Sequence, residues 1–480
     1  MVVSSDERTF LTKFIQEKIL FGNKLNPELF AILTVYFVQG ILGLARLAVS
    51  FFLKDEIGLT PAEVAMLTGI SSIPWIIKPV FGFLSDGVPI LGYRRRPYLI
   101  LSGFLGTLSW LALAFVVDSR LAATIAILMT SLSVAISDVI VDSLVVERAR
   151  EESLGQAGSL QSLCWGTSAV GGLITAYLSG WLLQHLSIST VFEITATFPL
   201  LVSAVAWMIA EERITVKSDR SSVVKTQVSQ LWQAVKQKSI WLPALFLFVW
   251  QATPNAESAF FFFTTNELGF EPEFLGRVRL VTSLASLIGI FIFQKYLKEV
   301  PFRKILAWNT VIASVLGMST LLLVTHVNRD LGIDDRLFSL GDSLVLTVMG
   351  QITWMPVLVL SARLCPKGVE ATLFALLMSI WNMSGLISNE LGALLTSALG
   401  ITETNFDKLW LLVIITNLST LLPLPFIGWL PKTDPQADSN MDNVAPGEVT
   451  PHNPVGASIE SSATPSLVPE FVANKTEEIE

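Results

Sequence analysis

Residues 74–117 read PWIIKPVFGFLSDGVPILGYRRRPYLILSGFLGTLSWLALAFVV, and this segment sets the architecture of the chain. It holds the end of one apolar stretch, a short turn with the cluster Arg94-Arg95-Arg96, and a second apolar stretch after Pro97. A helix of about 20 apolar residues crosses the ~30 Å hydrocarbon core of a bilayer. The segment therefore predicts two membrane-spanning helices joined by a tight basic turn.

The composition of the whole chain also indicates a membrane protein. Of 480 residues, 52% are hydrophobic and 15% are charged, whereas about a quarter of a soluble domain is charged. Mean hydropathy is +0.60. The formal net charge is −8, but residues 431–480 contribute nine acids against Lys432 and Lys475, so the remainder is nearly neutral. Without a basic surplus to neutralise phosphates, we expect no nucleic-acid partner.

Two further classes of site are not expected. Cys164 and Cys365 lie in or at the end of apolar stretches, and the three histidines are far apart in sequence, so we predict no disulfide framework, no metal site and no cofactor. Residues 1–30 mix acidic and basic side chains without a long apolar core. We therefore expect neither a signal peptide nor a transit peptide.

Scanning for apolar stretches long enough to span a bilayer predicts an all-α integral membrane protein with twelve transmembrane helices. The predicted spans are 31–53, 61–84, 97–117, 121–146, 155–183, 188–210, 240–263, 271–296, 303–325, 340–364, 369–399 and 407–430.

The orientation follows from the basic residues, which are retained on the cytoplasmic side. Most of them lie in the N-terminal tail and the even-numbered connections; the odd-numbered connections hold Lys54, Arg120, Arg329, Arg336 and Lys408. Both termini are therefore predicted to be cytoplasmic, in a monomer embedded in the lipid bilayer of the plasma membrane. The predicted divisions are residues 1–30, a first half at 31–210, a central loop at 211–239, a second half at 240–430 and a disordered acidic tail at 431–480.

The two predicted halves show a faint internal repeat. A shift of 212 residues superimposes Gln39 on Gln251 and Val88-Pro89 on Val300-Pro301. Parallel six-helix halves around a central site are the architecture of major facilitator transporters, and such repeats usually survive as weak hydropathy symmetry. We therefore predict two pseudo-symmetric six-helix halves in a major facilitator fold.

The fourth predicted span contains two acids. Asp138 and Asp142 are four residues apart, so they lie on one helical face about 6 Å apart along the axis. Charged groups in a bilayer are costly, and two close carboxylates resist simultaneous ionisation. A carboxyl that loads and releases a proton is what proton coupling requires. The alternative is a purely structural role, in which both acids pair with bases of neighbouring helices.

The charged turn after the second span resembles the gating loop of major facilitator transporters, in which an aspartate and arginines lock the cytoplasmic helix ends. In this role we expect Lys78, Asp86, Arg94, Arg95, Arg96, Glu147 and Arg148. Two alternatives stay open. The three arginines can serve only to fix the topology, and Lys78 can extend its ammonium group to the membrane interface.

Cationic and amide side chains within the spans are candidates for substrate binding. Arginine binds carboxylate through two parallel hydrogen bonds, which suits an anionic solute. Pro254 should break the seventh span and free polar groups to face a cavity. Tryptophan faces with nearby amides suit a flat heteroaromatic ring, although such tryptophans often only pack. The substrate candidates are Gln39, Arg46, Gln161, Trp165, Gln251, Asn255, Glu257, Arg277, Arg279, Gln351, Trp381 and Asn382.

Several stretches closely resemble the folate-biopterin transporter family, a branch of the major facilitator superfamily. They are Tyr36–Gly40, Lys54-Asp55, Pro74–Pro79, Ser85-Asp86, Gly92–Tyr98, Ser137–Arg150 and Leu160–Trp165. The resemblance is dense in the first half and sparse in the second. It implies secondary active transport of folates and pterins, coupled to protons, by alternating access, and therefore no enzymatic activity.

Two alternatives remain from the sequence alone. One is a proton-coupled carrier of another organic anion. The other is an integral-membrane prenyltransferase, in which an Asp-x-x-x-Asp helix holds Mg²⁺ on a diphosphate. Such an enzyme needs a second acidic cluster, but the repeat counterparts of Asp138 and Asp142 are Gly350 and Trp354.

Overall fold

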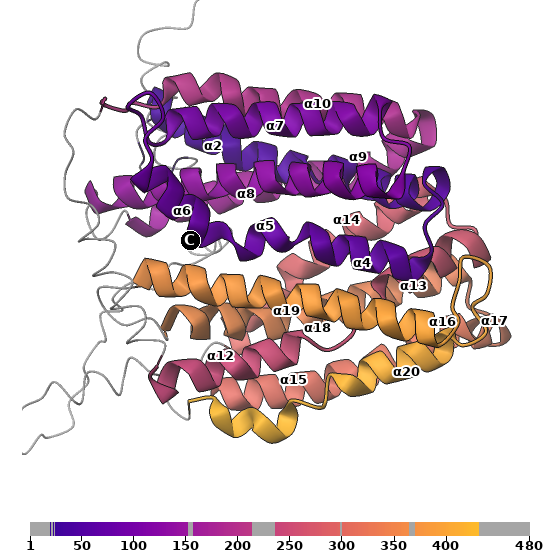
Figure 1. Cartoon of the computed structure of the whole chain (residues 1–480). Helices are drawn as coiled ribbons and strands as arrows, with labels where there is room; N and C mark the ends of the chain where they lie inside the picture. Colours follow the sequence, from indigo (N-terminus) through magenta and orange to yellow (C-terminus); the bar gives the residue numbers. More distant parts are fainter. Residues whose placement is uncertain are drawn as a thin grey trace, which may run out of the picture.

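The computed structural model describes most of the predicted membrane region as a helical bundle (Figure 1). Of the predicted divisions, most of residues 1–30, most of the central loop and nearly all of the tail lie outside the described residues. The described residues are 20, 23, 25–151, 157–213, 236–297, 300–363 and 370–431.

The helices of the first half follow the predicted spans. Their bounds are α2 (Pro27–Ile41), α3 (Leu44–Phe51), the π-helical turn η2 (Phe52–Glu56), α4 (Pro61–Ser71), α5 (Ile73–Ile76), α6 (Lys78–Gly87), α7 (Arg96–Phe115), α8 (Arg120–Glu151), α9 (Ala157–His185), α10 (Ile188–Val205) and the 3-10 turn η3 (Ala206–Met208).

The helices of the second half do the same. Their bounds are α12 (Lys238–Gln251), α13 (Glu257–Phe262), the π-helical turn η4 (Phe263–Glu267), α14 (Pro272–Ile292), the π-helical turn η5 (Phe293–Leu297), α15 (Phe302–Gly317), α16 (Thr320–Val324), α17 (Val327–Asp330), α18 (Asp335–Arg363), α19 (Glu370–Ala398), α20 (Leu409–Ser419) and the 3-10 turn η6 (Leu424–Trp429).

Within the described residues, eight helical stretches are long and apolar enough to cross a membrane. They are Pro27–Glu56, Pro61–Ser85, Arg96–Phe115, Arg120–Val145, Ile188–Met208, Pro272–Leu297, Phe302–Val324 and Leu409–Trp429. The other four predicted spans coincide with α9, α12 and α13, α18, and α19. Large apolar side chains such as Leu108, Trp308 and Val315 are at least 64% exposed on the bundle surface, as contact with lipid requires.

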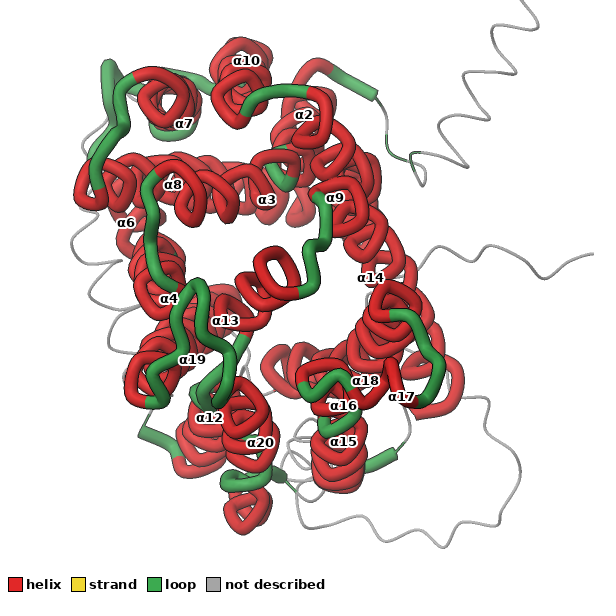
Figure 2. The backbone as a smooth tube through the Cα atoms, turned by 90° about the vertical axis from the view of Figure 1, so that its right-hand side faces the viewer, coloured by secondary structure: helices red, strands yellow, loops and turns green. Residues whose placement is uncertain are grey.

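Helices of the two halves lie on opposite sides of the bundle and meet along two seams (Figures 1 and 2). One seam joins α9 to α14, and the other joins α4 to α19 and α13. The α9–α14 seam is close because Gly180 faces Gly276: a Cβ atom on Gly180 would lie 2.2 Å from the carbonyl oxygen of Pro272 and 2.7 Å from Cα of Gly276. Small residues allow such close backbone approach between membrane helices.

The first span of each half is broken near its middle. α2 gives way to α3 at Leu42 and Gly43, and α12 gives way to α13 across residues 252–256. The break that Pro254 predicts in the seventh span is confirmed. Asn255 fixes this break, because its Nδ2 donates to Ser388 Oγ at 3.1 Å and to Asn389 Oδ1 at 3.0 Å on α19.

The two broken spans also end alike, at an offset of 211 residues. The π-helical turn at Phe52 recurs at Phe263, and each turn is followed by a glycine with positive φ, Gly58 at 70° and Gly269 at 65°. Pro61 and Pro272 then begin α4 and α14. The repeat that the sequence shows faintly at offset 212 is therefore a backbone repeat at the ends of these spans.

Gly180→Ala should weaken the α9–α14 seam, because the added Cβ has no room against Pro272 and Gly276. Overpacking of this kind costs about 1–3 kcal/mol. We expect a lower melting temperature in detergent. Gly172→Ala is the matched control on the same helix, since nothing lies within 4 Å of a Cβ atom built there. Equal melting temperatures for the two variants would contradict the close contact.

Candidate functional site

A group of four charged and polar side chains lies inside the first half, and we call it the carboxylate cluster: Tyr36, Lys78, Asp138 and Asp142. Lys78 Nζ forms an ion pair with Asp138 and lies 3.9 Å from Asp142 Oδ2. Tyr36 donates its hydroxyl hydrogen to Asp142 Oδ1 at 2.5 Å. Three elements, α2, α6 and α8, thus meet at one site.

The local backbone explains how Lys78 reaches the two acids. The second span is interrupted at Ile77, between α5 and α6, and Pro79 occupies the first turn of α6. Lys78 is the first residue of α6, and its Nζ lies 5.0 Å from the centre of the Trp75 ring. The ammonium group is thereby held inside the bundle, away from the membrane interface.

The carboxylate cluster has one more acid than base. The side chains of Lys78 and Asp138 are 22% and 13% exposed, whereas that of Asp142 is 46% exposed. With both acids ionised the cluster carries one net negative charge, and it becomes neutral when it takes up one proton. Because net charge is costly in a low-dielectric interior, the arrangement favours holding that proton.

The sequence interpretation covers this cluster in part. Asp138 and Asp142 share a helical face as predicted, and pairing of Asp138 with a base of a neighbouring helix is observed. Lys78, expected as a gating or interface residue, lies with the acids instead. Tyr36 was not singled out as a site residue, although a hydroxyl in the middle of an apolar span is a signal that could have found it.

Two arginines and a glutamate from both halves form a second charged group. Arg279 on α14 is partly buried and interacts electrostatically with Arg46 on α3 and Glu257 on α13. Arg46 and Glu257 follow the breaks in the first and seventh spans and are exposed, although both lie within apolar stretches. This group brings three predicted substrate residues together, with a net positive charge.

Arg277 is not part of that group. Its Nη2 lies 2.7 Å from Glu273 Oε1, one helical turn earlier, and its side chain is 60% exposed. Glu273 also accepts a hydrogen bond from the Tyr177 hydroxyl at 3.3 Å. Arg277 therefore belongs to a surface ion pair beside the α9–α14 seam.

The remaining amide and tryptophan candidates are dispersed. Gln39 Nε2 is buried without a hydrogen-bond partner among the described residues, beside a small cavity whose lining includes Ser102, Ser133 and Ser137. Gln251 ends α12 and is partly buried, and Gln351 packs on Gly289. These positions do not form one pocket with the charged groups.

Trp381 belongs to an aromatic group in the second half. Its ring centre lies 4.4 Å from that of Trp354 and 6.0 Å from that of Trp250. Asn382 donates to the Trp75 carbonyl of the first half at 3.3 Å, and Trp165 is 56% exposed. The side chain of Gln161 lies outside the described residues.

The arginine turn is held by an acid that sequence reasoning missed, Glu211. Its carboxylate accepts hydrogen bonds from the backbone N–H groups of Arg94, Arg95 and Arg96, the last at 3.0 Å, at the N-terminus of α7. A carboxylate at a helix N-terminus satisfies free donors and complements the helix dipole. The pair Glu211-Glu212, directly after the sixth span, is the signal that could have indicated it.

The arginine side chains add further contacts within the first half. Arg95 is 6% exposed and donates from Nη1 to Ser85 Oγ at 2.9 Å, and Arg96 donates from Nη2 to the Ile209 carbonyl at 2.7 Å. The expected partners Asp86, Glu147 and Arg148 have side chains outside the described part of the structure.

Comparison with known proteins decides the family. The model of the BT1 family matches residues 39–445. The chain belongs to the BT1 family. It is 60% identical to the folate-biopterin transporter of Synechocystis sp., with 96% of each chain covered. It is 32% identical to folate transporter 2 of Plasmodium falciparum, covering 84% of this chain and 89% of that protein.

Solved structures agree on the fold of this BT1 family member. A D-xylose-proton symporter matches with a TM-score of 0.62 at 13% identity, covering 85% of this chain and 99% of the symporter. The nucleoside transporter NupG matches with a TM-score of 0.61 at 13% identity, covering 84% and 99%. The predicted major facilitator fold and family are confirmed, and the chain is a multi-pass membrane protein. These matches are transporters, not prenyltransferases.

Glu211→Gln should loosen the arginine turn, because the amide keeps one acceptor oxygen but loses the charge that faces three N–H groups. Loss of a helix cap costs about 0.5–2 kcal/mol. We expect a lower melting temperature and faster proteolysis at residues 88–95. Glu212→Gln is the neighbouring control. If both variants resist protease equally, Glu211 does not hold the turn.

Proposed function

We propose that this chain is a secondary active carrier of folates and pterins that works as a monomer by alternating access. The observation that carries the proposal is the 60% identity, over 96% of both chains, to a protein named folate-biopterin transporter. Two Plasmodium falciparum relatives at 32% and 34% identity are named folate transporters. The major facilitator fold supports a carrier mechanism.

We propose proton coupling at the carboxylate cluster. One lysine faces two aspartates, so uptake of a single proton neutralises the group, and Asp142 is its more exposed acid. Lys78 can pair with either acid, since the two carboxylates lie on one helical face. Proton binding at Asp142 would leave the Lys78–Asp138 pair intact, so loading and release need no unpaired charge.

We propose that Arg46 and Arg279 bind the glutamate carboxylates of folate. Both lie among residues from the two halves, and together they carry one more positive charge than Glu257 balances. A carboxylate substrate would offset that surplus through charge-assisted hydrogen bonds. Pterins lack this tail, so their recognition would depend less on the arginines.

We further propose a plasma-membrane location with both termini in the cytoplasm. The supporting observation is the concentration of Lys and Arg in the N-terminal tail and even-numbered connections. In this orientation the turns η2 and η4 face the outside, and the arginine turn with Glu211 faces the cytoplasm.

Purified protein in liposomes tests the substrate directly. Uptake of folate and of an unconjugated pterin is expected when the outside is more acidic than the inside, and a dissipated gradient should abolish accumulation. Uptake of unrelated organic anions in place of both would instead support a proton-coupled carrier of another anion and overturn the folate proposal.

Asp142→Asn should abolish gradient-driven accumulation and leave substrate exchange across the membrane intact. The amide fits and still accepts the Tyr36 hydrogen bond, but it carries no proton. Asp138→Asn should act alike. Ser143→Ala is the control, because that hydroxyl bonds only to its own helix, at the Val139 carbonyl. Normal accumulation in both asparagine variants would remove the coupling role.

Arg46→Gln should weaken folate binding by about 1.5–3 kcal/mol, the range for a hydrogen bond to a charged group. Binding of an unconjugated pterin should change less, because it has no glutamate tail. Titration of both ligands against purified protein measures this difference. Arg277→Gln is the control, since Arg277 pairs with Glu273 at the surface. Equal losses for the two ligands would assign Arg46 a structural role.

A further inference from the structure

The two halves are joined most tightly at the end of the bundle where η2 and η4 lie, which Figure 2 views end-on. Phe262, from the second half, is 0% exposed and belongs to a core cluster with Phe52 and Phe192 of the first half. The rings of Phe51 and Phe261 pack edge to face, with centres 5.3 Å apart. This end of the bundle is therefore closed by apolar contact between the halves.

A lysine lies within that apolar closure. The side chain of Lys54, on η2, is only 11% exposed. Its Nζ lies 2.5 Å from Asp55 Oδ1 of the same turn and donates to Asn266 Oδ1 of η4 at 2.9 Å. The same ammonium lies 5.6 Å from the centre of the Phe51 ring. Desolvation of an ammonium group is costly, so these contacts are what make its position acceptable.

The backbone repeat gives this arrangement its geometry. At the offset of 211 residues, Asp55 corresponds to Asn266, so Lys54 bonds to both members of one repeat pair. The two turns have the same π-helical form and the same closing bond, Leu59 N to Leu53 O and Phe270 N to Thr264 O, each 2.9 Å. Two like turns thus face each other across the halves, with one ammonium between them.

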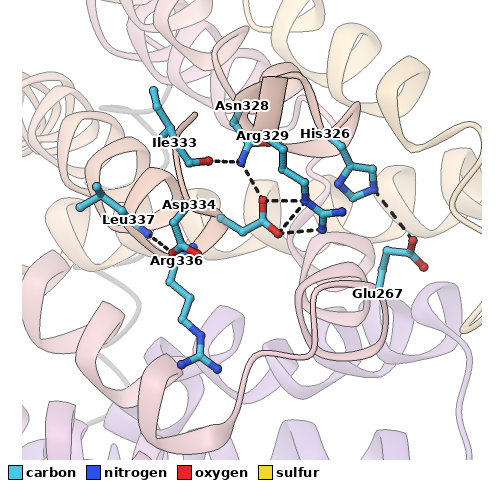
Figure 3. A network of polar contacts seen from close by, with 9 residues as sticks. Glu267, His326, Asn328, Arg329, Ile333, Asp334, Arg336 and Leu337 are labelled. Carbon is cyan, nitrogen blue, oxygen red and sulfur yellow. Dashed lines mark hydrogen bonds and ion pairs between the residues drawn. The ribbon is translucent and has the colours of Figure 1, made fainter. Parts of the chain in front are cut away.

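The turn η4 is positioned from its own half. Asn266 Nδ2 donates to the Glu403 carbonyl at 2.9 Å, which orients its oxygen toward Lys54. On the other side, His326 Nε2 lies 3.9 Å from Glu267 Oε1, and its ring packs on Phe263 (Figure 3). The loop that carries His326 is tied by the Arg329–Asp335 ion pair at 2.7 Å (Figure 3). Asn266 is therefore a fixed acceptor.

We propose that Lys54, Asp55 and Asn266 form a latch that holds this end of the transporter closed. Opening requires the Lys54–Asn266 hydrogen bond to break, while Asp55 stays with Lys54 on the first half. The latch needs no substrate. Its assignment to the outer face rests on the proposed orientation, so its test is designed to work without transport.

The first test measures access past the latch. In a background with both cysteines replaced by alanine, Ser50→Cys places a thiol one helical turn inside Lys54. Asn266→Ala and Lys54→Met should each raise its labelling rate by a membrane-impermeant maleimide about tenfold or more, as loss of a charged hydrogen bond predicts. Glu403→Ala is the matched control, because Glu403 contributes only its backbone carbonyl. Parent-like labelling in both latch variants overturns the proposal.

The labelling is done on vesicles of both orientations. A rise confined to inside-out vesicles supports the latch and overturns the proposed orientation. Because no folate is present, a failure to transport folate leaves this result unaffected.

A second test keeps the proposal falsifiable if a latch variant folds poorly. In the same background, Lys54→Cys with Asn266→Cys should form a disulfide under oxidation, stop transport of any substrate, and recover on reduction. Undiminished transport by the fully cross-linked protein overturns the latch.

Discussion

The pairing of Lys78 with Asp138 is the interaction on which the interior of the first half depends. An unpaired charge in the hydrocarbon region is costly, so α6 must bring its ammonium to α8. That requirement explains the break at Ile77, which lets the helix restart with Lys78 as its first residue. It also leaves Asp142 the less constrained acid, with Tyr36 as its hydrogen-bond partner.

Breaks in the helices serve the site in the same way in both halves. Free backbone groups inside a membrane protein must find partners, and Asn255 with Ser388 and Asn389 supplies them at the break in the seventh span. The reward is position. Arg46 and Glu257, each just beyond a break, interact with one arginine, Arg279, although they come from different halves.

Periodicity predicted what is local, and missed what joins distant segments. Span positions, the break at Pro254 and the shared face of Asp138 and Asp142 follow from hydropathy and helical spacing. Lys78 and Glu211 find partners 60 and 116 residues away, which no spacing encodes. Arg277 and Arg279 were grouped too readily, because residues two apart on a helix point to nearly opposite faces. Their separation was therefore available from the sequence.

The location of each charge pair limits how the molecule can move. The contacts of Lys78 with Asp138 and Asp142, and those of Glu211 with the arginine turn, lie wholly within the first half. Separation of the halves breaks none of them, so the first half can rotate as a rigid body. Side-chain hydrogen bonds that cross the halves, among the described residues, include Lys54 with Asn266, Tyr177 with Glu273 and Asn382 with the Trp75 carbonyl. The free energy of opening is therefore set by bonds at the seams, and the charge state of the carboxylate cluster can bias the motion only by changing what the halves enclose.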